Sequence, residues 1–285
     1  MPHARPARRR RGYRNDVAFS REHVRHPLVV RRLRVSAVSR VVPNIVRVTL
    51  SGPELAGFAS AGPTDHLKVF FPDPDTGILT VPEVGPDGMR RGAEGVVISR
   101  DYTPRAVRPH ELDLDIVVHG VDGPASAWAE LADVGDELGI AGPRGSRLAP
   151  EGVERLLVVV DETALPATGR WLELLPEVPV TALFHIVDEG VESYFDPAAA
   201  ERMDAEWITH ADGPAQLEES LRSLGRIDEG TFVFLAGEAD VLVPLRRYLR
   251  HELLLPAEQV SASGYWRRGI VNLDHHAPLD PSDPD

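Results

Sequence analysis

The hexapeptide Arg-Asp-Tyr-Thr-Pro-Arg at residues 100–105 brings a phenol ring, a hydroxyl group and two guanidinium groups together. On a strand, alternate side chains face the same way, so Arg100 and Tyr102 would share one side, while Thr103 and Arg105 would project near the strand's end. A tyrosine ring can lie flat against a planar ring system, a threonine hydroxyl can hydrogen-bond a ring nitrogen, and an arginine can pair with a phosphate. These residue types predict a flavin site in which Arg105 binds a phosphate.

A second candidate element is the start of a predicted helix, made of Gly123, Pro124, Ala125 and Ser126. The backbone amides of a first helical turn and the serine hydroxyl can point at phosphate oxygens, and small side chains allow close approach. Taken alone the segment is also an ordinary helix cap, but beside the hexapeptide it predicts a diphosphate site. His119, at the end of the preceding predicted strand, either contacts the flavin nucleotide or is a structural histidine, and both interpretations stay open.

Other motifs follow one another in a fixed order between residue 27 and about residue 270. They are His66–Pro72, the hexapeptide, His119 with Gly123–Trp128, Gly142–Gly145, Asp161–Ala167, Ala236–Glu238 and Gly264–Gly269. In this order they resemble the siderophore-interacting proteins, a flavin-dependent branch of the ferredoxin-reductase-like superfamily. The resemblance implies an FAD-binding antiparallel barrel, then an α/β domain for a reductant, which together reduce iron(III) bound in a siderophore.

The first half of the chain has the pattern of a β domain, which we place at residues 27–150. Short runs with glycine and proline punctuation predict six strands, at 28–42, 44–51, 66–72, 96–103, 111–119 and 136–140, with one helix at 124–132. Strands at this spacing are typical of a closed antiparallel barrel, which has no exposed edges. The expected fold of this half is a six-stranded antiparallel FAD-binding barrel.

The second half, residues 151–270, has the pattern of an α/β domain. Leu156–Val160 is a continuous apolar run, as expected for a strand buried on both faces. Predicted strands and helices then alternate, which indicates a Rossmann-like, doubly wound parallel sheet. Predicted helices lie at 163–175, 215–224 and 239–254, and further strands at 180–187, 206–209, 231–236 and 259–264.

Charge and composition limit the classes of partner. Residues 1–26 hold eight arginines and two acids, which gives this segment a net charge of +6. Because the whole chain has a net charge of −13, residues 27–285 carry −19. We interpret residues 1–26 as a basic flexible tail and 271–285 as a C-terminal tail, and we expect an acidic, monomeric cytoplasmic protein that binds neither nucleic acid nor membrane. The chain has no cysteine, which excludes disulfides, cysteine-ligated iron–sulfur clusters and thiolate zinc sites.

The electron donor's site is less conventional. The first strand of the α/β half is followed by Asp161, Glu162, Thr163 and Ala164 rather than by a glycine-rich turn, so a purely structural role competes with nucleotide binding. Acids at 188–189 favour NADH over NADPH, and a reduced ferredoxin remains an alternative donor. The cofactor-binding residues predicted from this half are Asp161, Thr163, Ala164, Gly237, Glu238 and Trp266.

Anionic substrates require cations near the flavin, and the resemblance places them at similar positions here. The candidates are Lys68, Arg144, Arg147, Arg267 and Arg268. Each is also explained as an ordinary surface cation. Tyr265 and Trp266 either cover the flavin or close the core between the domains. We predict no metal site, because the adjacent histidines at 275–276 lack the spacing of a ligand set.

The leading hypothesis is a cytosolic, FAD-dependent ferric-siderophore reductase in which the protein contributes position and electrostatics and no side chain acts as a catalytic acid or base. Two alternatives stay open. One is a flavin reductase or electron-transfer partner of another oxidoreductase. The other is a noncatalytic, siderophore-binding flavoprotein.

Overall fold

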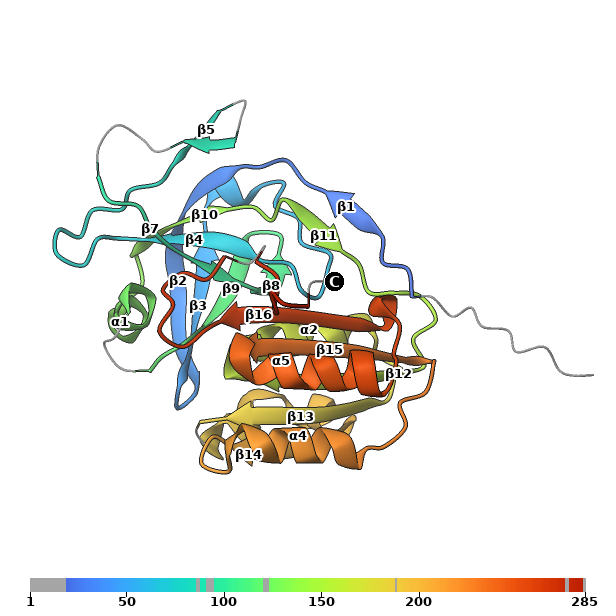
Figure 1. Ribbon diagram of the computed structural model, residues 1–285. Helices are drawn as coiled ribbons and strands as arrows, with labels where there is room; N and C mark the ends of the chain where they lie inside the picture. Colours follow the sequence, from blue (N-terminus) through green and yellow to red (C-terminus); the bar gives the residue numbers. More distant parts are fainter. Residues whose placement is uncertain are drawn as a thin grey trace, which may run out of the picture.

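The computed structural model describes residues 19–85, 88–90, 95–119, 123–187, 189–274 and 277–283. Residue 188 and residues 275–276, which the sequence had singled out, lie outside this description. The described chain forms two large sheets, a curled antiparallel one above a parallel one in the view of Figure 1, and two small two-stranded sheets. Among the described helices, none combines the length and the apolar character needed to cross a bilayer.

The antiparallel sheet has the strand order β7-β4-β10-β2-β3-β9-β8. Its two outer strands, β7 and β8, are consecutive in the chain and are separated only by Thr103, so the sheet must curl round to place them at opposite ends of the order. Helix α1 (Pro124–Leu131) packs on this curl. The strands are β2 (Val30–Val42), β3 (Ile45–Ser51), β4 (Leu67–Phe71), β7 (Ile98–Tyr102), β8 (Pro104–Arg108), β9 (Glu111–Val117) and β10 (Glu137–Ala141).

The prediction of six strands missed β8. Pro104 begins this strand, a position where a proline does not interrupt the ladder, and the register with β9 shifts between Pro104 and Ala106. The core of the curled sheet follows the expected alternation: Val48, Leu50 and Leu112 are fully buried. The prediction of an antiparallel β half is therefore correct, although its strand count differs from the seven in the structure.

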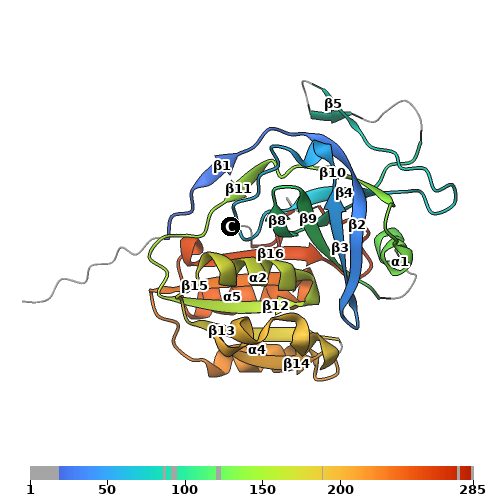
Figure 2. The ribbon, with the colours of Figure 1, turned by 180° about the vertical axis from the view of Figure 1, so that it is seen from behind.

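The second sheet confirms the predicted parallel, doubly wound arrangement. All its neighbouring strands are parallel, in the order β14-β13-β12-β15-β16. Helix α2 (Leu165–Leu174) covers the face seen in Figure 2, and α4 (Gly213–Ser223) and α5 (Ala239–Arg247) cover the face seen in Figure 1. The strands are β12 (Arg155–Asp161), β13 (Val180–Ile186), β14 (Met203–Thr209), β15 (Thr231–Glu238) and β16 (Val260–Trp266).

Short elements complete the second half. They are the 3-10 turns η2 (Glu162–Ala164), η3 (Glu189–Tyr194) and η5 (Ala257–Gln259), helix α3 (Pro197–Glu201) and the π-helical turn η4 (Tyr248–Glu252). In the first half, η1 (Pro53–Leu55) follows β3, and a small hairpin of β5 (Glu83–Gly85) and β6 (Gly88–Arg90) projects away from the body.

Both predicted tails are shorter than the sequence suggested. At the N-terminal end, Phe19 is 3% exposed in the core of the α/β half, and β1 (His23–Arg25) pairs with β11 (Gly145–Arg147). At the C-terminal end, Leu279 is buried, and Asp280 pairs with Arg247 of α5 at 2.5 Å. Nonlocal contacts bury these few apolar residues, whereas composition alone predicted that the charged residues around them would be solvated.

Candidate functional site

A cleft of about 1590 Å³ lies between the two sheets. Its volume exceeds the roughly 300–1,000 Å³ of ordinary small-ligand pockets, so it has room for a dinucleotide. The barrel side of the wall comes from the end of β7, the loops before β4 and the start of α1. The other side comes from the turn after β12, from the end of β16 and from residues 267–273 that follow it.

The hexapeptide supplies the centre of the barrel wall. Arg100, Tyr102 and Thr103 all line the cleft. The Tyr102 ring packs edge-on against Phe71, with ring centroids 6.1 Å apart, and burial raises the pKa of its hydroxyl. Burial also raises the pKa of Tyr265 on the opposite wall, and a hydrogen bond with Thr103 partly offsets that shift. The two tyrosines therefore stay neutral at physiological pH.

The predicted phosphate arginine does not lie in this wall. Arg105 is in β8, which turns toward α2, and its Nη1 donates to Glu173 Oε1 at 2.7 Å. It also packs so closely on Gly169 that a Cβ there would lie 3.0 Å from its guanidinium carbon. Arg105 is absent from the cleft lining, whereas Arg100 is part of it. Arg105 therefore lies outside the cleft lining, because the chain changes direction at Thr103 and Pro104, and its assignment to a phosphate stays a prediction.

The start of α1 reaches the cleft as predicted, with Gly123, Pro124, Ala125 and Ser126 in its lining. Gly123 has a φ of 147°, which favours glycine, and among the described residues no side-chain hydrogen bond caps the helix at this position. The Ser126 hydroxyl accepts a hydrogen bond from the His119 backbone N–H at 3.0 Å. His119 itself is exposed and lines the cleft, so the first turn presents small side chains and uncapped amides to this space.

On the α/β wall, Asp161 is a buried structural hub. Its Oδ2 accepts from the Glu238 backbone N–H and from Trp266 Nε1, each at 2.8 Å. Its Oδ1 accepts from the Thr163 backbone N–H at 2.9 Å and from the Thr163 hydroxyl at 2.5 Å. Burial raises the pKa of Asp161, and these four donors oppose that shift. A carboxylate already surrounded by protein donors has little capacity left for a nucleotide.

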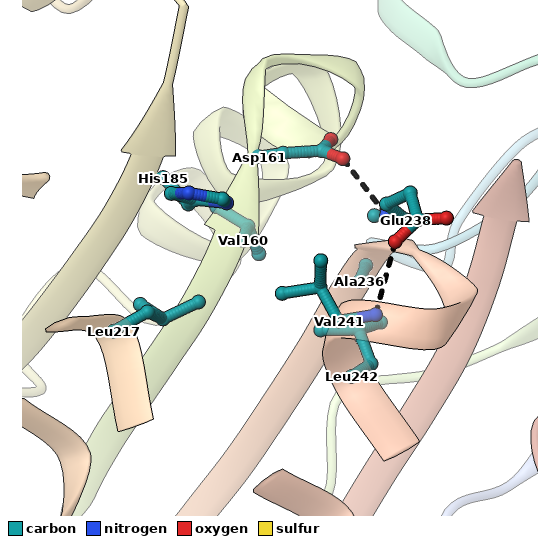
Figure 3. Close-up of a pocket in the computed structure, with 9 residues that line it drawn as sticks. Val160, Asp161, His185, Leu217, Ala236, Glu238, Val241 and Leu242 are labelled. Atoms are coloured by element: carbon teal, nitrogen blue, oxygen red, sulfur yellow. Dashed lines mark hydrogen bonds between the residues drawn. The ribbon is translucent and has the colours of Figure 1, made fainter. Parts of the chain in front are cut away.

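The crevice beside Asp161, where the sheet's strand order reverses between β12 and β15, is nearly filled (Figure 3). Its volume is about 10 Å³, enough for one water molecule at most. Gly237 approaches Asp161 so closely that a Cβ would lie 2.5 Å from the carboxylate. Glu238 caps α5 by accepting from the Val241 N–H at 3.0 Å, and Ala164 is fully buried. In the structure these residues take part in packing and capping, and their assignment to a cofactor stays a prediction.

Thr163 and Trp266 belong both to the cleft lining and to the hydrogen-bond network of Asp161. Both line the large cleft, although each also donates to Asp161. Trp266 therefore joins the end of β16 to the end of β12, and it still presents part of its ring to the cleft. Both interpretations offered for Tyr265 and Trp266 are compatible with this placement, because the same side chains line the cleft and close the junction.

Two histidines lie against each other, with tilted rings, at the ends of β13 and β14. The rings of His185 and His210 have centroids 4.2 Å apart. Burial, reinforced by His210, lowers the pKa of His185 to about 4, and its Nε2 has no hydrogen-bond partner among the described residues. Burial also lowers the pKa of His210, which lines the large cleft. Both rings are therefore mainly neutral at pH 7.

The predicted substrate cations are separated by the structure. Lys68 pairs with Asp101 at 2.8 Å, and neither Lys68 nor the exposed Arg144 lines the cleft. Arg147, Arg267 and Arg268 do line it. Arg147 and Arg268 are exposed side chains, and for neither does the described part of the chain record an ion pair. Three of the five predicted substrate cations therefore line the cleft, and two do not.

Arg267 is held by contacts with α5 and with the C-terminal segment. Its Nε lies 3.1 Å from Asp240 Oδ1, and its Nη2 donates to the Leu279 carbonyl at 3.2 Å. It is thus tied to α5 and to the C-terminal segment, which the sequence had treated as a tail. These two contacts fix the position of the guanidinium, and the carboxylate of Asp240 partly offsets its positive charge.

Several residues of the cleft were not predicted. Arg21 reaches it from the N-terminal segment, and Asn44 reaches it from the turn between β2 and β3. The Asn44 Oδ1 is buried without a partner among the described residues. Asp115 also lines the cleft, bound by Arg47 at 2.7 and 2.8 Å. Asn44 in a Pro-Asn turn has an ordinary local explanation, so nothing in the sequence marked it.

These observations test whether FAD fits. The barrel wall offers an aromatic ring at Tyr102, an uncapped helix start at Gly123, a guanidinium at Arg100 and a buried amide oxygen without a partner at Asn44. The ring offers a stacking surface, the helix start and the guanidinium offer donors, and the amide oxygen offers an acceptor. A flavin nucleotide needs all of these, and the cleft has the volume for it. The filled crevice beside Asp161, by contrast, does not fit a nucleotide diphosphate in the conventional Rossmann position.

Two family models match successive parts of the chain. Residues 34–147 match the siderophore-interacting FAD-binding domain, and residues 153–269 match the siderophore-interacting protein domain. An NADPH-dependent ferric-chelate reductase of Escherichia coli is 36% identical over 88% of this chain and 98% of its own length. A ferric vibriobactin reductase of Vibrio cholerae is 32% identical over 88% of this chain and 93% of its own.

Solved structures with the same fold include members of the same family. A siderophore utilization protein from T. fusca has a TM-score of 0.81 and 39% identity, over 90% of this chain and 100% of that one. Phthalate dioxygenase reductase, at 13% identity and a TM-score of 0.60 over 82% of this chain and 68% of that one, shares the fold. With both domain matches in order and over most of its length, the chain belongs to the siderophore-interacting protein family.

Proposed function

We propose that this protein is an FAD-dependent reductase of iron(III) siderophores that takes its electrons from a reduced pyridine nucleotide. The observation that carries the proposal is the cleft between the sheets, which combines the flavin-type wall at Tyr102 and Gly123 with cations at its rim. The relatives named as ferric-chelate and ferric vibriobactin reductases support the reaction class.

Bound FAD supplies the redox chemistry, since it can accept electrons in a pair and release them singly. The residues of this chain supply position. We assign Tyr102 to the isoalloxazine ring, Thr103 to a polar edge of that ring, and Arg100 with the backbone N–H groups of Gly123, Ala125 and Ser126 to the diphosphate. All of these line the cleft. Arg100 takes the role first given to Arg105, because Arg105 is held by Glu173 outside it.

We also propose a division of labour along the chain. Residues 27–150 would bind FAD and residues 151–270 would receive the electron donor. We treat β7 and β8 as one bent strand that closes the curled sheet into a six-stranded barrel, since only Thr103 separates them. The bend at Thr103 then places Tyr102 and Thr103 at the opening that faces the α/β half.

The substrate is held by charge rather than by coordination. Among the described residues there is no cluster of potential metal ligands, so iron stays in its own chelator. Arg147, Arg267 and Arg268 at the rim would attract an anionic siderophore, and the acidic remainder of the protein sharpens that contrast. Reduction to iron(II) weakens binding by hard oxygen ligands, which releases the metal from the siderophore.

The donor most consistent with the relatives is NADPH or NADH, since one relative is named for NADPH. With the crevice beside Asp161 filled, we place the nucleotide in the large cleft, toward Thr163, His210 and Trp266. The alternative donor is a reduced ferredoxin, which would need no nucleotide crevice.

The test is an anaerobic experiment on the FAD-loaded protein. It is mixed separately with NADPH, NADH and reduced ferredoxin while flavin absorbance at about 450 nm is followed. The reduced protein is then mixed with an iron(III) siderophore in the presence of an iron(II) trap. We expect at least one pyridine nucleotide to bleach the flavin, and the siderophore to restore the colour with stoichiometric iron(II). If a donor bleaches the flavin and the siderophore leaves it reduced, the proposed reaction is wrong.

A further inference from the structure

The N-terminal strap, residues 19–26, crosses from one half of the molecule to the other. At one end, Phe19 is buried in the α/β core and packs edge-on against Phe232, with ring centroids 5.6 Å apart. At the other end, β1 forms a ladder with β11, and the His26 backbone N–H donates to the Arg144 carbonyl at 2.9 Å. The strap is therefore anchored in both halves, although its charge had suggested a free tail.

Two side chains of the strap, Arg21 and His23, line the cleft, and Arg21 is the one that contacts both of its walls. Its Nε donates to the Leu148 carbonyl and its Nη2 to the Arg147 carbonyl, each at 2.9 Å. Its other contacts lie on both walls, with Nη2 at 3.5 Å from Thr64 Oγ1 and Nη1 at 3.4 Å from Ser261 Oγ. One guanidinium thus joins the segment after β11 to β16 across the cleft.

Aromatic rings support the same group from below. The guanidinium carbon of Arg21 lies 5.3 Å from the Trp171 ring centroid and 5.7 Å from that of Phe232, within the range of cation–π attraction. Burial and the neighbouring Arg147 lower the pKa of Arg21 to about 10, so it remains charged at neutral pH. A planar five-donor fork suits this geometry better than a lysine ammonium would.

We propose that Arg21 is a positioning residue for anionic siderophores: it fixes the backbone that carries Arg147 at the cleft rim and adds a second positive charge beside it. The inference rests on the proposed function, because it deepens the substrate side of the same cleft. It assigns a role to a segment that precedes both matched domains, the first of which begins at residue 34.

The chain offers a matched control in the same segment. Arg25 lies four residues further along, in β1, and its side chain is exposed. Arg25→Met removes the same formal charge from the strap without touching the Arg147 carbonyl. Arg21→Lys keeps the charge and loses the fork, so the series Arg21→Met, Arg21→Lys and Arg25→Met separates net charge, local charge and positioning.

The experiment measures binding of redox-inert complexes to the FAD-loaded protein by calorimetry. One probe is a trianionic gallium(III) tris-catecholate, and the other is a neutral gallium(III) tris-hydroxamate. We expect Arg21→Met to weaken binding of the trianionic complex at least tenfold at low salt and of the neutral complex less than threefold. Arg21→Lys should lie between Arg21→Met and the wild type, and Arg25→Met should change either affinity by less than twofold. Amide hydrogen exchange at residues 144–148 should accelerate in both Arg21 variants.

Three results would overturn the inference. They are an Arg21→Met affinity within twofold of wild type, equal losses for both complexes, or no binding of the trianionic complex by the wild type. Failure of the proposed function has a different signature, since a wild type that binds the gallium complex but does not reduce the iron complex would leave the role of Arg21 intact.

Discussion

The two walls of the cleft use their polar groups in opposite ways. Within the described part of the chain, the barrel wall has a helix, α1, that starts without a side-chain cap, and a buried Asn44 Oδ1 that has no partner. On the α/β wall, Asp161 accepts four hydrogen bonds and Glu238 caps α5. Buried polar groups are normally paired, so an unpaired set beside a large cleft indicates a ligand, whereas a paired set indicates structure. Resemblance of sequence motifs alone does not separate these two cases.

Removing Asp161 should give the largest effect on stability and show that this wall is structural. In Asp161→Ala, the Glu238 N–H and the Trp266 Nε1 lose a buried acceptor, and we expect the free energy of unfolding to fall by about 4 kcal/mol. Denaturant titration of the flavin-free protein measures this loss. The control Asp204→Ala, an exposed position in β14, should change it by less than about 0.5 kcal/mol. A loss equal to that of the control would show that the hub is not structural.

A pair of arginine variants tests the barrel wall. Arg100→Ala should raise the Kd of FAD about 50-fold, corresponding to the loss of a charge-assisted contact of about 2–3 kcal/mol. Arg105→Ala should change the Kd less than threefold, because Arg105 pairs with Glu173 away from the cleft. Fluorescence titration of FAD into each flavin-free variant provides the comparison. The opposite ranking would restore Arg105 as the phosphate ligand and contradict the geometry.

The buried histidine predicts a smaller, pH-dependent effect. The pKa of His185 is about 4 in the folded protein and about 6.5 when exposed, so the unfolded chain binds more protons between these values. Stability from this group is therefore complete above pH 6.5 and is lost as pH falls, by about 2 kcal/mol at pH 5. Thermal unfolding of wild type and His185→Phe at pH 8 and pH 5 tests this. The variant should lose correspondingly less stability on acidification, and identical pH profiles would rule out His185 as the source.

The fold was largely predictable because its patterns are local. The apolar run at Leu156–Val160 and the alternation of polar and apolar residues at 111–116 both identify strands directly. The alternation predicts one exposed face, however, whereas Asp113 and Asp115 are buried. The role of Arg105 was not predictable, because the bend at Thr103 depends on the pairing of β8 with β9. Phe19 and Arg21 were missed for a related reason: their partners, such as Phe232 and Arg147, lie more than 100 residues away.

Within the site, the residues predicted from small size and shape were placed best. Gly123, Ser126 and Tyr102 line the cleft, as their types suggested. The charged residues were placed less well. Lys68 pairs with Asp101 outside the cleft lining, and the buried Asp161 carboxylate accepts hydrogen bonds from the protein itself. A charge is recognisable in a sequence, but its partner is chosen by tertiary contacts.

The most direct test of the account is a single-turnover experiment on the prereduced, FAD-loaded protein under anaerobic conditions. Stopped-flow mixing with a trianionic iron(III) siderophore should return the flavin absorbance at a rate that saturates with siderophore concentration, and an iron(II) trap should recover two equivalents of iron per flavin. A rate constant for capture that falls steeply as salt rises is also expected, because the cations at the rim are screened. Reduced flavin that persists through the mixing, with no trapped iron(II), would contradict the central claim.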